Sequence, residues 1–270
     1  MLSSWLKVFS FFGWWFAVWL PVSLIVSRSL DWQPNEIPSP KQKLVLLASL
    51  YILIPAVLGW EIKLKEPITL IYLGLSFRSQ FFPHLLWGLI LSLVSLTLVF
   101  SIESASNLVN WRRQNVKQLL SSCLPILVLS LLISLAEELV FRGYVFSTLL
   151  LGNSRIVAAI GSSIIFAVLH LIWERKQTLL QIPGLCLMGM VLVLARVVGD
   201  DTIYLPIGLH AGWIWGLTCI DSAELITYNN QSHWMTGMER QPLAGVAGIL
   251  CLTVTALAVW GIAKVNLLWL

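Results

Sequence analysis

Five ionisable residues lie within apolar segments of the central part of the chain. Glu137 and Glu138 stand side by side in a long apolar run, and Arg142 follows Glu138 by four positions. His170 and His210 occur in two further apolar segments. An ionisable group at membrane depth is costly and is usually retained for function. Two carboxylates and two imidazoles could activate a water molecule, relay protons or bind a metal ion.

Helical spacing gives the two adjacent glutamates different neighbours. Arg142 is rotated by about 40° from Glu138, within reach of an ion pair, and by about 140° from Glu137. We therefore expect Glu138 and Arg142 to pair and to serve mainly structure. Glu137 points elsewhere, which leaves its carboxylate available as a general base or proton shuttle.

The two histidines are expected to face a common cavity. His170 shares a helix face with Phe166, four residues earlier, so the phenyl ring can form a wall beside the imidazole. Three glycines recur at every fourth position of the segment that carries His210: Gly208, Gly212 and Gly216. Their face is predicted to pack against a neighbouring helix, with His210 projecting from the opposite side. Either histidine alone could be a hydrogen-bonded packing residue, but their combination with the glutamates favours a site.

The composition indicates an integral membrane protein. Hydrophobic residues make up 58% of the 270 residues and charged residues only 11%, whereas soluble domains carry about 25% charged residues. Fourteen tryptophans suit a chain that crosses the bilayer several times, because indole rings anchor in the headgroup region. The net charge of +4 is spread over short loops without a basic stripe, which argues against nucleic acid as a partner and favours contact with lipid headgroups.

Long apolar runs predict an all-α, polytopic membrane protein of about eight transmembrane helices, since barrel strands would alternate in polarity. The run from Leu119 to Leu150 is too long for one perpendicular crossing of a roughly 30 Å hydrocarbon core. Pro125 is expected to start or kink it, with Ser121 or Ser122 as its cap. The eight predicted spans are Trp5–Val26, Leu44–Trp60, Phe82–Phe100, Leu119–Leu150, Ile156–Ile172, Leu179–Val198, Leu205–Ile220 and Leu243–Ala263.

These spans are expected to form one integrated membrane domain with three parts. Residues 1–118 would supply the N-terminal transmembrane helices and their connecting loops. Residues 119–220 would form the central part, which contains all five ionisable residues. Residues 221–270 would add a polar loop and the C-terminal transmembrane helix.

In chain order, Glu137-Glu138-x-x-x-Arg142, Phe166-x-x-x-His170 and His210 resemble the motifs of the CAAX-protease and bacteriocin-processing (CPBP, or Abi) family. Its members are multi-pass intramembrane endopeptidases and include the type II enzyme that removes the last three residues of prenylated CaaX proteins. The resemblance covers about residues 119–215 and implies that residues 119–220 form a CPBP-like catalytic core. It implies that Glu137 is the general base and that His170 orients the water, with Glu138 and Arg142 as support. His210 would then face the tetrahedral oxyanion.

The resemblance predicts hydrolysis of a peptide bond in a membrane-embedded or lipidated substrate, of which a prenylated protein is one example. Two other functions are compatible with the residues. The chain could be a non-catalytic membrane scaffold or partner protein of the same fold. As a weaker alternative, Glu137, His170 and His210 could relay protons in a transporter, which would require a polar path to both membrane faces.

Two features of the motifs leave the chemistry open. The family has been regarded as metal-dependent, and Glu137, His170 and His210 are an acceptable zinc set, yet the chain has no HExxH motif. The residues slightly favour a water-activating site that retains no tight metal. The family's third motif often reads HxxxN, whereas this chain has Ile214 at the asparagine position. Asn229 or a bound water would have to replace the missing amide.

Overall fold

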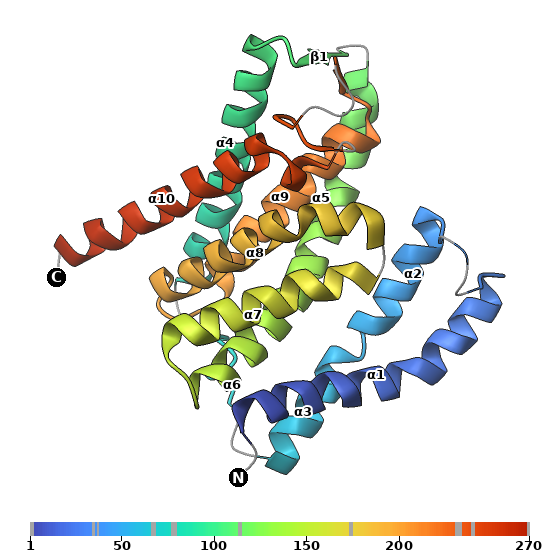
Figure 1. Ribbon diagram of the computed structural model, residues 1–270, viewed down its shortest axis with the longest axis vertical. Coiled ribbons are helices and arrows are strands. Elements are labelled where there is room, and N and C mark those ends of the chain that lie inside the picture. Colours follow the sequence, from blue (N-terminus) through green and yellow to red (C-terminus); the bar gives the residue numbers. More distant parts are fainter. Residues whose placement is uncertain are drawn as a thin grey trace.

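The computed structural model shows a bundle of long helices that pack side by side (Figure 1). It describes residues 3–33, 36, 38–65, 69–76, 80–112, 115–172, 175–229, 234–238 and 241–268. The elements are α1 Ser4–Ser29, α2 Pro40–Tyr51, α3 Ile54–Lys65, α4 Phe81–Ala105, β1 Val109–Trp111, α5 Val116–Glu138, a π-helical segment Leu139–Val145, α6 Phe146–Leu150, α7 Arg155–Leu169, a 3₁₀ turn His170–Ile172, α8 Arg175–Val198, α9 Tyr204–Ser222, β2 Ile226–Tyr228, a 3₁₀ turn Pro242–Ala244 and α10 Val246–Leu268. The predicted all-α polytopic fold is confirmed.

Each of the eight predicted spans corresponds to a helical region, although their bounds and their fitness to cross a bilayer differ. Among the described residues, six regions are long and apolar enough to span a membrane: Ser4–Ser29, Pro40–Glu61, Phe81–Ala105, Val116–Leu150, Arg155–Ile172 and Thr178–Val198. The apolar part of α10, Val246–Gly261, is shorter, and α9 is not among the six. The first ten residues of α9 are enclosed by the rest of the protein. They therefore pack against other helices and do not face lipid.

The fourth predicted run begins earlier than its apolar residues suggested. Helix α5 starts at Val116, and Ser121 and Ser122 lie inside it, where their hydroxyls donate to carbonyls three or four residues earlier. The predicted cap at these serines is therefore wrong. A tertiary contact holds the start of the helix, because Asn115 Nδ2 donates to the carbonyl of Ala223 at 2.9 Å, just beyond α9.

The same run changes its helical form beyond Glu138. Pro125 lies inside α5 and does not begin it, and the backbone between Leu139 and Val145 is π-helical. Such a segment leaves carbonyl groups displaced from the regular α-helical pattern and often marks a functional site. The buried guanidinium of Arg196, from α8, donates through Nη1 to the carbonyls of Arg142 and Gly143 in this segment.

Helix α9 lies between α4 and α5. Its glycine face packs on α4, as predicted: a β-carbon on Gly208 would lie 2.1 Å from the carbonyl oxygen of Leu85, and one on Gly212 would lie 2.9 Å from the β-carbon of Ser92. This close approach fixes the rotation of α9 and turns His210 away from α4, towards α5. Beyond the two helices, β1 and β2 pair in an antiparallel manner, with Val109 opposite Tyr228.

Candidate active site

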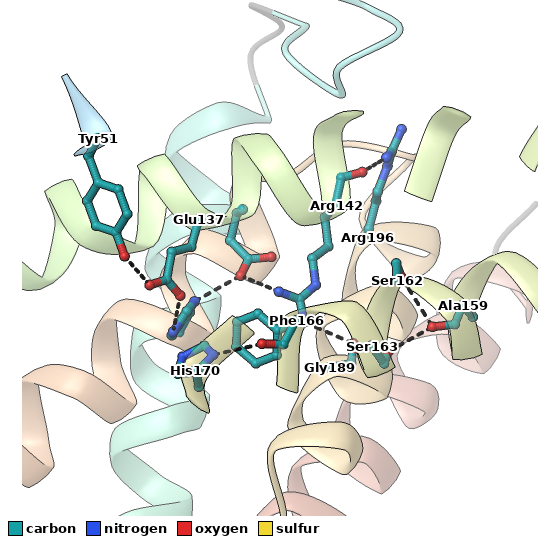
Figure 2. A network of polar contacts seen from close by, with 12 residues as sticks. Tyr51, Glu137, Arg142, Ala159, Ser162, Ser163, Phe166, His170, Gly189 and Arg196 are labelled. Atoms are coloured by element: carbon teal, nitrogen blue, oxygen red, sulfur yellow. Dashed lines mark hydrogen bonds and ion pairs between the residues drawn. The ribbon is translucent and has the colours of Figure 1, made fainter. Parts of the chain in front are cut away.

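The five residues singled out from the sequence come together from separate elements, and Figure 2 labels three of them, Glu137, Arg142 and His170. Glu137 and Glu138 lie in the last turn of α5, and Arg142 lies in the π-helical segment that follows. His170 begins the 3₁₀ turn after α7, and His210 lies in the first half of α9. Four of the five are buried and His170 is half-buried, so the bundle encloses a polar site in an apolar interior.

Glu138 is hydrogen-bonded to two of the other residues. The predicted ion pair is present, with Arg142 Nη1 3.0 Å from Glu138 Oε1 and both side chains at most 1% exposed. The same oxygen lies 2.8 Å from Nδ1 of His210, a contact that the sequence did not predict. Because an ionised carboxylate only accepts hydrogen bonds, Nδ1 of His210 carries the proton and donates it. Glu138 therefore orients the imidazole as well as pairing with Arg142.

The phenyl ring of Phe166 fixes the relative positions of the cationic side chain and the two imidazoles. The guanidinium of Arg142 stacks over this ring, 4.5 Å from its centroid, in a cation–π contact. The imidazoles of His170 and His210 meet the ring edge-on, with centroids at 4.5 and 6.0 Å. The prediction that Phe166 forms a wall beside His170 is confirmed.

Glu137 has one carboxylate oxygen engaged and one directed to His210. Oε1 accepts a hydrogen bond from the hydroxyl of Tyr51, at the end of α2 (Figure 2). Oε2 lies 3.7 Å from Nε2 of His210, beyond the 2.7–3.2 Å of a direct hydrogen bond, and has no hydrogen-bond partner among the described residues. Tyr51 was missed in the sequence, because a single tyrosine in an apolar run 86 positions upstream carries no distinguishing signal.

His170 is held in one tautomer by the backbone. Its Nδ1 lies 2.8 Å from the carbonyl oxygen of Phe166, and a carbonyl oxygen only accepts, so Nδ1 carries the proton. In the neutral imidazole, Nε2 is then an acceptor that can orient a water molecule. The 3₁₀ turn that begins at His170 interrupts the α-helix and directs the side chain into the site.

Two cavities meet at Glu137 and His170. The first cavity, of about 270 Å³, lies among α4, α8, α9 and α10 and also contains His210. The second cavity, of about 630 Å³, lies among α1, α2, α5 and α8 and also contains Tyr51. Both are lined mainly by apolar side chains, and Gln181 of α8 lines both. The polar site is therefore accessible to ligand groups from two apolar chambers.

The metal-ligand set suggested by the sequence is Glu137, His170 and His210. Within the part of the chain that the structure describes, no three His, Cys, Asp or Glu side chains are grouped to hold a metal ion. The hydrogen bonds of this set use Oε1 of Glu137 and Nδ1 of both histidines, and contacts of this kind also orient the side chains of metal ligands.

The missing amide is not replaced by Asn229. Ile214 stands at the asparagine position of the family's third motif and lines the first cavity one helical turn beyond His210. Asn229 follows β2 and is bound there, donating to the carbonyl of Asn107 and accepting from Asn110 Nδ2. The suggested replacement is therefore wrong, because the strand pair holds this side chain. Among the described lining residues of the first cavity, Gln181 is the one that carries a side-chain amide.

Comparison with known proteins supports the resemblance in the motifs. Residues 119–216 match the family model described as type II CAAX prenyl endopeptidase Rce1-like. This segment contains all five residues of the site and supports membership of the CPBP, or CAAX-protease, family. No match was found among curated proteins or among solved structures. The part of the chain that the structure describes has six helical regions long and apolar enough to span a bilayer, so the chain is an integral, multi-pass membrane protein.

Proposed function

We propose that this member of the CPBP family is an intramembrane endopeptidase that uses an activated water molecule. The observation that carries the proposal is the placement of Glu137. One carboxylate oxygen is held by Tyr51, and the other faces His210 across 3.7 Å at the junction of two cavities, beside His170. A buried carboxylate with one oxygen free in an accessible cavity is suited to general-base catalysis.

Each step can be assigned to a side chain. Oε2 of Glu137 takes a proton from a water molecule that Nε2 of His170 orients, and the hydroxide attacks the carbonyl carbon of the scissile peptide. The oxyanion that forms faces Nε2–H of His210 in its imidazolium form, which Glu138 stabilises through Nδ1–H. The tetrahedral intermediate collapses as the C–N bond breaks, and Glu137 returns its proton to the leaving amine. No covalent enzyme intermediate forms.

The walls of the cavities support a membrane-associated substrate. The described lining residues are mainly apolar, and five of the helices that carry them, α1, α2, α4, α5 and α8, belong to regions with the length and composition of membrane spans. A hydrophobic peptide segment or a lipidated tail, such as a prenylated one, can enter such a site from the bilayer without leaving an apolar environment. A soluble, folded protein would have to expose an extended segment there at a high desolvation cost.

A non-catalytic scaffold of the same fold is the second candidate. Ile214 favours it, because an isoleucine at this position cannot donate a hydrogen bond to the oxyanion. A proton-coupled transporter receives less support, because both cavities beside Glu137 have mainly apolar walls, whereas a proton path requires a continuous polar one.

The test compares membrane peptide pools from cells that carry the wild-type protein or the Glu137→Ala variant. We expect peptides that appear only with the wild type and whose ends define the scissile bond. Glu224→Gln is a matched control, because this glutamate is an exposed partner of Arg112 at the surface. Identical pools, together with normal biological function of Glu137→Ala, would favour the scaffold over the protease.

A further inference from the structure

Glu103 is a buried carboxylate in the first cavity that the proposed reaction does not use. It lies in the last turn of α4, and its side chain is 4% exposed. Its Oε2 atom is buried and has no hydrogen-bond partner among the described residues. Glu103 lines the same cavity as Glu137, His170 and His210, so a ligand that fills this cavity contacts both Glu103 and the candidate catalytic residues.

The described lining residues of the first cavity provide no cationic side chain for Glu103. The other polar side chains in the described lining, apart from the candidate catalytic residues, are Gln181, Tyr228, Thr236, the thiol of Cys251 and the indole of Trp213, which donates to Ser95. None of the described lining residues is Lys or Arg. A buried carboxylate without a cation carries a desolvation penalty of several kcal/mol, which a cationic ligand group would offset by pairing with it. The remaining walls are apolar, so they suit a hydrophobic ligand with one cationic group.

We propose that Glu103 is a specificity-determining residue that binds a Lys or Arg side chain of a hydrophobic substrate segment lying in the first cavity. The proposal rests on the proposed function in so far as the bound segment is the substrate. It names a substrate class that neither the five-residue motif nor the apolar walls imply, namely a membrane-associated peptide with a single basic residue at a set distance from the scissile bond.

The packing of α4 on α9 gives that distance. The two helices run in the same direction, with Gly208 against Gly88 and Gly216 against Leu96. His210 therefore lies opposite a position of α4 that is about 13 residues before Glu103. At 1.5 Å per residue, the separation along the helix axis is about 20 Å. An extended peptide advances about 3.3 Å per residue, so the basic residue lies about six residues from the scissile bond, or about four when its long side chain reaches along the cavity.

Binding to a synthetic peptide tests the proposal without depending on cleavage. The full-length Glu137→Gln protein, in lipid nanodiscs, is titrated with a Leu/Ala-rich peptide that carries one Lys, and with matched peptides that carry Gln or Glu at that position. A hydrogen bond to a charged group is worth about 1.5–3 kcal/mol, so we expect the Lys peptide to bind roughly tenfold to hundredfold more tightly than the Gln peptide. Adding Glu103→Gln should remove this preference, and Glu103→Lys should reverse it in favour of the Glu peptide.

Two control variants distinguish a local effect from a general one. Adding Glu224→Gln in place of Glu103→Gln removes the same charge from an exposed site and should leave the Lys preference intact. If Glu103→Gln does not fold, Glu103→Asp keeps the charge on a shorter side chain and should retain a preference for Lys. A Lys preference that is the same with and without the Glu103 carboxylate would overturn the proposal.

The outcomes also separate this proposal from the protease. A Lys preference that depends on Glu103, in a protein whose wild type cleaves no membrane peptide, would overturn the protease alone. Cleavage that depends on Glu137 but shows no basic residue near the scissile bond, together with unchanged binding by Glu103→Gln, would overturn the specificity site alone.

Discussion

Nδ1 of His210 lies 2.8 Å from Oε1 of Glu138. Through this contact, the residue predicted to serve mainly structure also determines which nitrogen of the imidazole faces Glu137. A carboxylate that fixes the tautomer and orientation of a histidine is a common element of hydrolytic sites. Arg142 contributes indirectly, because its 3.0 Å ion pair holds Glu138 in place. Glu138 and Arg142 are thus positioning residues in the proposed mechanism.

We expect Arg142→Ala to lower the stability of the protein much more than Glu137→Gln. Removal of Arg142 leaves the carboxylate of Glu138 buried without its cation, and breaking a buried pair costs about 3–5 kcal/mol in soluble proteins. In Glu137→Gln, the side-chain amide oxygen can still accept from Tyr51. Thermal unfolding in detergent measures both, with the exposed Arg155→Ala as a control. Equal losses in the first two variants would contradict this division.

The features that depend on local spacing could be predicted from the sequence. The apolar runs located the helices, and the four-residue spacings predicted both the pairing of Glu138 with Arg142 and the glycine face of α9. The features that depend on tertiary contacts could not. The contact of His210 with Glu138 requires the docking of α9 on α5, and the hydroxyl of Tyr51 arrives from a helix whose sequence carries no motif. The start of α5 likewise depends on a contact with Ala223.

Substitutions at the three candidate catalytic residues should reduce cleavage to different extents. Glu137→Ala should abolish it, and His170→Ala should come close, because a general base and the group that positions its water act as a unit. His210→Ala should retain a trace, since one oxyanion donor is typically worth about 10²–10³ in rate. Rates on a peptide identified from the membrane pools measure this order. Inhibition by serine-directed reagents would contradict the mechanism, which has no covalent intermediate.

Tyr51→Phe should slow cleavage without unfolding the protein. The substitution removes the hydroxyl that holds Oε1 of Glu137, while the ring remains to fill its space. Loss of one hydrogen bond to a charged group corresponds to about 1.5–3 kcal/mol, or roughly a tenfold to hundredfold loss in rate. Tyr72→Phe is the matched control, because its hydroxyl contacts Thr148 rather than the site. A rate for Tyr51→Phe equal to that of the control would show that Glu137 needs no such support.

Gly208→Ala should destabilise the protein by separating α4 from α9. A β-carbon at this position would lie 2.1 Å from the carbonyl oxygen of Leu85, and the backbone must move to relieve the overlap. Overpacking of this kind costs typically 1–3 kcal/mol and occasionally more. Gly13→Ala is the control, because nothing lies within 4 Å of a β-carbon at that position. Similar melting temperatures for the two variants would contradict the close packing of the glycine face.

Ile214→Asn should raise the rate of peptide cleavage. Ile214 lies in the wall of the first cavity, four residues after His210, so an amide there would face the same oxyanion as Nε2 of His210. One such donor is typically worth about 10²–10³ in rate, and we expect a smaller gain because Gln181 already brings an amide to this cavity.

Gln181→Met should accordingly lower the rate, and adding Ile214→Asn should restore part of it. Ile214→Leu keeps the site apolar and should bring no gain. If Ile214→Asn leaves the rate unchanged both alone and with Gln181→Met, the oxyanion does not lie between His210 and this turn of α9, and the proposed role of His210 would have to be abandoned.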